Sequence, residues 1–453
     1  ICLSRGLGDV YKRQPFRFNI NVLNIKDDRL SIEGDIDLLY SDKFKIICEN
    51  NDETFEIPVQ KDYFARLNNF LGYELFKTYY KFEIPLQKNN KLKFYAVYGD
   101  KKVTLIEYFN PNSFISNFKF SYRKYHDYVL SKSKDKSTIY IKKEGRFLKE
   151  FKYQLLLLKK RKLKNIIYRD VALVKKQFKK KKEIWLISDR QDKAGDNGEA
   201  FFKYLCELKP KNIDFYFVID KKSSDFERIK QYGKVMSFDT FKYNVKFMIA
   251  DKIISSQADQ HVYKPFGGNN QYMFDLFDYK IIFLQHGIIK DDLSPWLNKF
   301  RLNLDMFVTS AESEYNSIIS NPYYGYSKDV VKLTGLPRFD LLEDNQEKHH
   351  SILICPTWRA NLAPKVNDET NYSPEFKQSN FFNFYNKLLN DKDILSVMKQ
   401  KQYKIRFCLH YRIRGQIKDF DKNEFVEMVT QPDYRYEFMS NDLLITDLSL
   451  IHI

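Results

Sequence analysis

The stretch from Glu183 to Asp220 reads EIWLISDRQDKAGDNGEAFFKYLCELKPKNIDFYFVID, and it decides the fold. An apolar strand pattern, EIWLISDR, leads through a polar loop into a helical pattern, EAFFKYLCEL, and a second apolar strand, IDFYFVID. KIISSQAD, KIIFLQHG and DMFVTSAE continue as strand ends that run into loops, and VKLTGLPRFD and SILICPTWR repeat the arrangement. This alternation predicts two doubly wound α/β units in series. A polar break from Glu343 to His350 separates a first α/β domain, 183–343, from a second, 344–453.

The chain before this series follows another pattern. From about Phe16 to Ser133, segments such as RFNINVLNI, LSIEGDIDLLY and KFEIPL alternate apolar and polar residues between turn residues. Such alternation is typical of half-buried strands and predicts an antiparallel, immunoglobulin-like sandwich over residues 15–140. The segment carries no chemical motif, so we expect a domain that supports or binds.

Residues 141–182 form a basic link between these parts. From Arg146 to Lys182 there are 15 Lys or Arg and two acids, with neither Gly nor Pro, in a chain of formal net charge +17. Helical spacing of the apolar residues predicts one long amphipathic helix. We expect it to dock on anionic lipid headgroups; a linker helix whose apolar stripe packs on the next domain is the alternative, and both can hold. Nucleic acid is not expected as a partner, because reading motifs are absent. The stripe consists of Leu148, Phe151, Leu155, Leu158, Leu163, Ile166, Ile167, Val171, Val174 and Phe178.

Length and composition set further bounds. A chain of 453 residues with 43% apolar residues can bury two or three cores. Its five cysteines include no CxxC pair, which argues against a zinc site or a disulfide framework, so we expect no metal. No apolar run approaches the roughly 20 residues that span a bilayer.

Both ends of the chain resemble translated sequencing-adapter read-through. ICLSRGLGDVYKRQ, residues 1–14, and LSLIHI, residues 448–453, carry this resemblance. We therefore expect these segments to be non-native and the second α/β domain to be incomplete after Asp447. Ordinary termini are the alternative.

Two motifs in the first α/β domain follow strands or precede a helix. Asp196, Asn197 and Gly198 lie before a helix whose free N–H groups attract anions, although helix capping by Asp196 or Asn197 is the simpler interpretation of those two residues. His286 and Gly287 follow an apolar strand. A histidine at a strand's carboxyl end can take a proton near neutral pH; a structural histidine is the alternative.

Four later clusters offer groups that bind phosphate, each again at the end of a predicted strand, where doubly wound sheets bind ligands. Arginine suits bidentate contact with phosphate, although Arg338 could instead pair with Asp340 within its turn. The clusters are Arg338 with Asp340, Thr357 with Arg359, His410, and Thr446 with Asp447.

In this order the motifs resemble the CDP-glycerol glycerophosphotransferase family, the teichoic acid primases and polymerases. The resemblance covers about Glu183 to Asp447 and rests on DNG with FF, HG, TGLPRFD, PTWR, a His after a strand, and ITD. It implies a GT-B fold, with acceptor chemistry on the first α/β domain and the CDP-alcohol on the second. By the resemblance, His286 would deprotonate the acceptor hydroxyl, which attacks the β-phosphorus of CDP-glycerol and releases CMP. The residues that would neutralise the pyrophosphate are Arg338, Thr357, Arg359 and His410.

The resemblance also implies partners and a place in the cell. CDP-glycerol would be a co-substrate, with no cofactor, and a polyprenyl-diphosphate-linked glycan or polymer the acceptor, at the cytoplasmic face of the cell membrane. Tyr411 stands where the family commonly has proline, and Leu448-Ser449-Leu450 where it has Tyr-Ser-Ser. If the end is adapter sequence, donor-binding serines are missing and the chain is expected to be inactive. The alternatives are a GT-B glycosyltransferase that uses a nucleotide sugar, a CDP-ribitol ribitolphosphotransferase, and a membrane-associated scaffold that binds polymer.

Overall fold

The computed structural model describes residues 16–63, 76–108, 121–179, 182–342, 349–362, 373–432 and 434–447. The chain divides into two compact units, one formed by residues 1–285 and 289–337 and the other by residues 286–288 and 338–453. The ends that resemble adapter sequence, 1–14 and 448–453, lie outside the described residues, as do residues 343–348 of the polar break that was predicted from Glu343 to His350.

The first unit begins with an all-β region in which eleven described strands form one hydrogen-bonded sheet. In β7, Asn90, Leu92, Phe94 and Ala96 are buried and alternate with more exposed neighbours, as the period-2 pattern predicts. The pairs are antiparallel except that β1 runs parallel to β8. Because the strands share one network rather than two separate sheets, the predicted immunoglobulin-like sandwich is not confirmed. The strands are β1 (Phe16–Lys26), β2 (Arg29–Leu39), β3 (Lys45–Asn50), β4 (Glu53–Ile57), β5 (Val59–Asp62), β6 (Lys77–Pro85), β7 (Asn89–Tyr98), β8 (Lys101–Tyr108), β9 (Tyr122–Tyr125), β10 (Tyr128–Lys132) and β11 (Thr138–Lys143).

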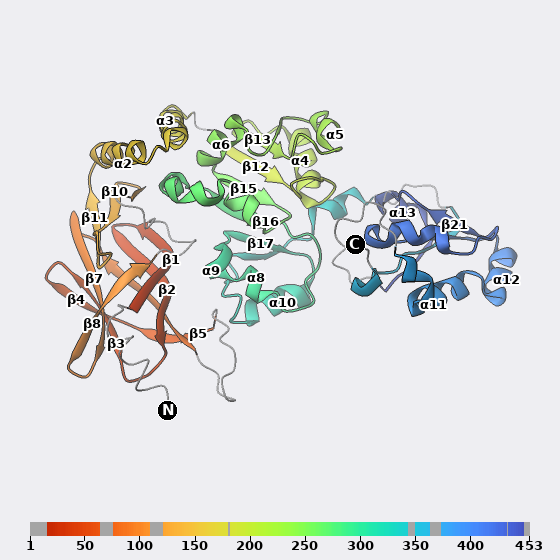
Figure 1. Ribbon diagram of the computed structural model, residues 1–453, viewed down its shortest axis with the longest axis horizontal. Coiled ribbons are helices and arrows are strands. Elements are labelled where there is room, and N and C mark those ends of the chain that lie inside the picture. The colour runs from red at the N-terminus through yellow and green to blue at the C-terminus, as the bar shows by residue number, and fades with distance from the viewer. Residues whose placement is uncertain are drawn as a thin grey trace. The chain divides into compact units, whose positions relative to one another are not determined.

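Two helices, coloured gold in Figure 1, follow the all-β region where one long helix was predicted. Helix α2 (Phe147–Lys159) ends in a tight turn of three residues, after which α3 (Leu163–Gln177) begins. Arg161 takes φ +55° in this turn, and the N–H of Lys162 reaches back to the carbonyl of Leu157 at 2.9 Å. An arginine in the left-handed region is uncommon, so the sequence pattern gave no sign of the break.

A buried ion cluster holds the two helices together. The guanidinium of Arg169 on α3 is fully buried and contacts the carboxylates of Glu150 on α2 and Asp275, with donor–acceptor distances from 2.6 to 2.9 Å. The hydroxyl of Tyr122 in β9 also donates to Glu150. A buried arginine needs such partners, because an unpaired charge in the interior is costly. The cluster therefore joins the all-β region, both helices and the α/β region of the same unit.

Eight of the ten residues in the predicted apolar stripe of these helices face outward, whereas Ile166 and Val171 are half-buried and pack against core clusters. Polar and aromatic residues such as Glu150, Tyr153 and Arg169 are buried, whereas nine apolar side chains are more than half exposed. The alternative, in which the stripe packs on the next domain, therefore holds for Val171 and not for the exposed side chains. No helix in the described ranges is long and apolar enough to cross a membrane. The nine exposed side chains, called here the apolar face, are Phe147, Leu148, Phe151, Leu155, Leu158, Leu163, Ile167, Val174 and Phe178.

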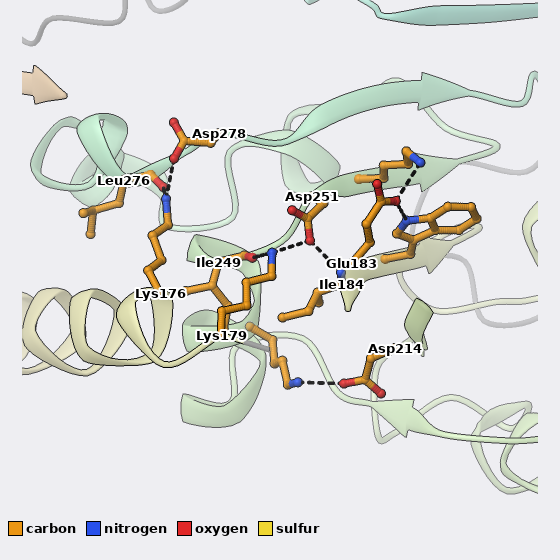
Figure 2. Close-up of polar contacts among 12 residues, drawn as sticks. Lys176, Lys179, Glu183, Ile184, Asp214, Ile249, Asp251, Leu276 and Asp278 are labelled. Atoms are coloured by element: carbon orange, nitrogen blue, oxygen red, sulfur yellow. Dashed lines mark hydrogen bonds and ion pairs between the residues drawn. The ribbon is translucent and has the colours of Figure 1, made fainter. Parts of the chain in front are cut away.

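Lysines at the end of this basic segment are bound to the α/β region. Figure 2 shows Lys176 on α3 paired with Asp278 at 2.6 Å and in contact with the carbonyl of Leu276. Lys179, just after α3, pairs with Asp251, whose carboxylate also accepts the N–H of Ile184 at 2.6 Å. These two lysines therefore fasten the helices to the first parallel sheet.

That sheet contains seven described strands in the order β14-β13-β12-β15-β16-β17-β18, all parallel. Numbered from β12 this is 3-2-1-4-5-6-7, which contains the Rossmann order. The predicted doubly wound α/β fold is confirmed here. The elements are β12 (Glu183–Ser188), α4 (Asn197–Leu208), β13 (Ile213–Val218), α5 (Phe226–Lys230), β14 (Val235–Met236), α6 (Phe241–Met248), β15 (Lys252–Ser255), α7 (Gln260–Tyr263), η1 (Gly267–Tyr272), η2 (Phe274–Leu276), β16 (Lys280–Phe283), α8 (Ser294–Leu297), α9 (Lys299–Leu302), β17 (Met306–Thr309), α10 (Glu312–Ser320), β18 (Val331–Leu333) and η3 (Pro337–Leu341).

The second unit contains a smaller parallel sheet in the order β21-β20-β19-β22, drawn in blue in Figure 1. Numbered from β19 this is 3-2-1-4, the same start as in the first sheet. Its core includes Leu389, Ile405 and Phe407. The elements are β19 (Ser351–Ile354), η4 (Ala360–Leu362), η5 (Pro374–Gln378), α11 (Asn380–Leu389), α12 (Lys392–Lys401), β20 (Lys404–Cys408), η6 (Tyr411–Asp419), β21 (Val426–Val429), α13 (Tyr434–Ser440) and β22 (Leu443–Ile445).

Candidate active site

In each parallel sheet the strand order reverses beside the first strand. The reversal lies between β12 and β15 in the first sheet and between β19 and β22 in the second. The loops that leave such a point diverge, so ligands of doubly wound sheets bind outside the carboxyl ends of these strands. The polar motifs that the sequence singled out follow strands in both sheets.

In the first unit, the buried carboxylate of Asp189 organises the turn that enters α4. Asp189 directly follows β12 and accepts the backbone N–H groups of Asp196 at 3.1 Å, Gly198 at 2.7 Å and Glu199 at 3.0 Å. Burial, followed by the nearby Asp196 carboxylate, raises the pKa of Asp189 to about 7. The N–H groups at the start of α4, which were predicted to attract an anion, therefore donate to the carboxyl group of Asp189.

The three residues of the DNG motif have different tasks. Asp196 is the N-cap of α4, and its side chain accepts the N–H of Asn197 at 2.8 Å, so the capping interpretation is correct for Asp196. A methyl group on Gly198 would lie 2.5 Å from Asp189 Oδ1 and 2.6 Å from the Ser188 carbonyl oxygen. Only glycine fits there without a shift of the backbone.

Asn197 connects this turn to the loop after β16. Its Nδ2 donates to the carbonyl of Gln285 at 2.6 Å, and the side chain is fully buried. Gln285 has φ +64°, a strained value for a residue other than glycine. The amide of Gln285 donates to Glu314 at 3.2 Å, and Glu314 also accepts the N–H of Ile289 at 2.8 Å. Asn197 and Glu314 therefore fix the chain on both sides of residues 286–288, and Gln285 is the left-handed residue of this turn.

In the second unit, His286 is half-buried and its backbone is held by Arg338. Nη1 of Arg338 donates to the carbonyl of His286 at 3.0 Å. The turn before Arg338 contains Gly335 with φ +79°, a left-handed conformation that favours glycine. Arg338 thus supports the histidine's main chain, and Asp340 lies beside it in η3.

The switch point of the second sheet brings four of the predicted residues together. Thr446 Oγ1 donates to the carbonyl of Cys355 at 2.6 Å, and Asp447 accepts the N–H of Thr357 at 2.6 Å. Asp447 also forms an ion pair with Arg359. Although burial raises the pKa of Asp447, the bonds from Thr357 and Arg359 lower it overall. In the described part of the chain, the Thr357 hydroxyl has no hydrogen-bond partner, so it can serve a ligand.

His410 follows β20 and belongs to an aromatic shelf. Its ring stacks on Trp358 with centroids 5.9 Å apart, and the guanidinium of Arg412 lies 5.5 Å from the Trp358 ring. Nδ1 of His410 accepts the N–H of Arg412 at 3.3 Å, which leaves Nε2 as the ring's second polar atom. Trp358 thus links His410 to the neighbouring Thr357 and Arg359.

Sequence reasoning missed Asp189 and Glu314. Asp189 carried a usable signal, since it is a carboxylate directly after the apolar strand EIWLIS. Glu314 carried none, because an acid in the first turn of a helix is ordinary. Among the described residues, no group of three or more His, Cys, Asp or Glu is placed to hold a metal ion.

Comparison with known proteins gives one family. The model of the CDP-Glycerol:Poly(glycerophosphate) glycerophosphotransferase family matches residues 170–453. The minor teichoic acid biosynthesis protein GgaB of Bacillus subtilis (strain 168) is 35% identical over 466 residues, which cover 98% of this chain and 51% of that protein. The chain therefore spans about half the length of this relative.

Solved structures give weaker likenesses. The wall teichoic acid polymerase TagF aligns with a TM-score of 0.44 at 17% identity, over 67% of this chain and 76% of TagF. A putative UDP-N-acetylglucosamine 2-epimerase from Listeria monocytogenes aligns with a TM-score of 0.36 at 10% identity, over 59% of this chain and 75% of the epimerase.

Proposed function

Because this chain belongs to the CDP-glycerol glycerophosphotransferase family, we propose that it transfers glycerol phosphate from CDP-glycerol to the terminal hydroxyl of a teichoic-acid or capsule-type polymer. The acceptor is a polymer on a polyprenyl diphosphate carrier, and CMP is released. The observation that carries the proposal is the turn at Gln285, which Asn197 and Glu314 fix immediately before His286. A strained, doubly held backbone beside a histidine is a common device for aiming a catalytic group.

The proposed chemistry needs one base and several cations. His286 takes the proton of the acceptor hydroxyl, whose oxygen attacks the β-phosphorus of CDP-glycerol. The bond from that phosphorus to the bridging oxygen breaks, and CMP leaves with the electron pair. Positioning and charge stabilisation supply most of the catalysis in phosphoryl transfer. In this proposal the two α/β domains form a GT-B pair that needs no cofactor.

The second unit supplies the groups proposed for the pyrophosphate. The Thr357 hydroxyl is available to a phosphate oxygen, and Asp447 holds Arg359 beside it. Arg338 and His410 complete the set of side chains proposed to bind the pyrophosphate. In the bound state the pyrophosphate competes with Asp447 for the Arg359 guanidinium, so the ion pair keeps that group in place until the donor arrives.

A release assay tests the reaction. Purified protein with polymer acceptor is incubated with labelled CDP-glycerol, CDP-ribitol and UDP-sugars, and nucleotide release and polymer growth are measured. CMP release from CDP-glycerol, lost in His286→Ala with unchanged thermal stability, supports the proposal. UDP release identifies a glycosyltransferase instead, and release from CDP-ribitol alone identifies a ribitolphosphotransferase. If the wild type and His286→Ala both bind the polymer and neither turns it over, the chain is a polymer-binding scaffold.

The apolar face of α2 and α3 supports a peripheral place on the cytoplasmic face of the cell membrane. Its nine side chains are 52 to 80% exposed and are interspersed with lysines. Exposed apolar surface of this extent marks an interaction site, and an apolar row beside basic residues suits an anionic lipid interface. Lys176 and Lys179 are engaged within the protein, so the apolar side chains are the better target for a test.

Vesicle sedimentation tests the membrane proposal. Phe147→Ser with Phe151→Ser should weaken binding to phosphatidylglycerol vesicles by about tenfold or more, since each buried Phe contributes about 1.5–3 kcal/mol. The matched control changes Leu208 and Val397, which are 56% and 47% exposed on α4 and α12, to serine. Equal binding by both variants would overturn this part of the proposal.

A further inference from the structure

The first unit contains a cavity of about 890 Å³. It lies at the amino-terminal ends of strands in the first parallel sheet, opposite to the carboxyl-end edge that carries the Gln285 turn. Lys280, the first residue of β16, lines it, whereas Gln285 follows the other end of the same strand. Asp305, just before β17, lines it as well. The rest of the wall includes β1 and β9 of the all-β region, η2, and residues of α3, α7 and α9. Its volume lies within the range of roughly 300–1,000 Å³ typical of ligand sites.

The all-β region and the α/β region are fastened together around this cavity. Nη2 of Arg123 in β9 donates to the carbonyl of Phe277 at 2.9 Å. Elsewhere between the same two regions, the ring of Tyr79 stacks on Phe300 with centroids 5.6 Å apart. Lys299 forms an ion pair with Glu33 as well. The cavity is therefore a feature of a well-connected pair of regions within one unit.

The lining carries more positive than negative charge. Six Lys or Arg and one His face three Asp. Asp275 is committed to Arg169. Asp278 pairs with Lys176 at 2.6 Å and with Arg123 at 3.6 Å, so these two lining cations are committed as well. The other lining cations, Lys124, Arg146, Lys264 and Lys280, face the single remaining carboxylate of Asp305. Lys124 is exposed and forms no ion pair in the described part of the chain. The surplus of cations over available carboxylates suits a ligand with repeated negative charge.

Lys264 supports the same interpretation. Burial, followed by the nearby charge of Arg301, lowers the pKa of Lys264 to about 8. A bound anion would favour the charged form of Lys264 and so raise this pKa again. Lys264 lines the cavity from the region after α7, on the α/β side, whereas Lys124 lines it from the all-β side.

Aromatic and amide groups complete the lining and indicate the rest of the ligand. Rings of Tyr125, Tyr263 and Tyr279 lie in the wall, together with the side-chain amides of Asn24 and Asn303. Aromatic faces pack on the carbon skeleton of polyols and sugars, and amides and carboxylates bond their hydroxyl groups. A wall that alternates cations with such groups differs from one that binds phosphate alone.

We propose that this cavity binds a phosphodiester-linked polyol or glycan chain, with the lysines on the phosphates and the rings and amides on the polyol. The concave wall fits a chain better than a flat lipid surface, which meets the outward apolar face of α2 and α3. The inference goes beyond the proposed function, because it rests on the lining alone and stands whether or not the Gln285 edge transfers glycerol phosphate.

The test measures binding of a soluble, fluorescent poly(glycerol phosphate) oligomer by anisotropy. Lys124→Gln, Lys264→Gln and Lys280→Gln are combined in one variant. Its Kd should rise about tenfold or more, since three charge-assisted contacts are lost. The control combines Lys43→Gln, Lys91→Gln and Lys101→Gln, which remove the same charge from exposed positions on the all-β region, and its Kd should stay within about twofold.

Three further arms make the result decisive. Saturating CDP-glycerol and the His286→Ala change should both leave oligomer binding unchanged; loss in either would place the oligomer at the Gln285 edge and overturn the inference. Equal binding by the triple variant and its control would also overturn it. The triple variant is also tested for binding to phosphatidylglycerol vesicles. If it loses vesicle binding but keeps oligomer binding, the three lysines contact lipid headgroups instead. If the wild-type protein binds the oligomer but transfers no glycerol phosphate from CDP-glycerol, the proposed function is refuted and the cavity site stands.

Discussion

Replacing Gly198 with alanine should destabilise the first α/β region because no space exists for a methyl group. The new carbon would lie 2.6 Å from the carbonyl oxygen of Ser188, and ordinary contact begins near 3.4 Å. Ser188 belongs to β12, a central strand of the sheet, so its carbonyl cannot retreat. The start of α4 must therefore move by about 0.8 Å, the difference between these distances.

Such a shift acts on the bonds that hold the turn. Gly198 N–H lies 2.7 Å and Glu199 N–H 3.0 Å from the buried carboxylate of Asp189. At pH 8, above the pKa of about 7, Asp189 is charged, and a hydrogen bond to a charged group contributes about 1.5–3 kcal/mol. Overpacking adds about 1–3 kcal/mol. Loss of one bond with modest strain gives about 3–5 kcal/mol, or roughly a 10 °C lower Tm.

Urea unfolding followed by tryptophan fluorescence measures this effect, since Trp185 lies in β12. Gly145→Ala is the matched control, because nothing lies within 4 Å of its added carbon and its backbone is not left-handed. The control should remain within about 0.5 kcal/mol of the wild type. If Gly198→Ala also does so, the close approach at Asp189 and Ser188 is not what the turn requires, and the argument for the glycine fails.

Three other changes have defined outcomes. Arg169→Met should cost about 3–5 kcal/mol in urea unfolding because Glu150 and Asp275 remain buried without a counter-ion; adding Glu150→Gln and Asp275→Asn should recover part of it, and no recovery would contradict the ion-pair explanation. Thr357→Val should lower kcat/KM for the donor about 2–10-fold with an unchanged Tm; unchanged kinetics would exclude the hydroxyl from the donor site. Although burial raises the pKa of Asp214, hydrogen bonds from two lysines and a tyrosine hold it at about 2. Because this is below the unfolded value of about 3.9, the stabilisation is present above about pH 4 and lost as the pH falls towards 2. Asp214→Asn should therefore be less stable than the wild type near neutral pH and match it at the acid end, whereas a pH-independent difference would contradict the assignment.

Most strands of the two parallel sheets could be predicted from the sequence because each is an apolar run that ends in polar residues. KIIFLQHG gave β16 and the turn after it, and SILICPTWR gave β19 and the Thr357 cluster. In these segments the local pattern of apolar and polar residues agrees with the final burial, so this pattern alone was enough to predict the strands.

The parts that could not be predicted depend on partners distant in sequence. The break between α2 and α3 requires a left-handed Arg161, and the helices then meet through Arg169 and Glu150. The strained Gln285 is held by Asn197, 88 residues earlier, and by Glu314, 29 residues later. No local pattern reports such contacts.

The Arg169 cluster also sets an order of events during synthesis on the ribosome. Glu150 precedes Arg169 by 19 residues, so both can leave the exit tunnel together, but Asp275 follows Arg169 by 106 residues. At roughly 5–20 residues per second, the arginine waits about 5–20 s for its second carboxylate. During that interval α2 and α3 can pair with each other through Glu150 and Arg169 but cannot pack on the rest of the unit through Asp275. Their apolar face is already formed at this stage. A nascent chain in this state exposes apolar side chains before the ion cluster is complete.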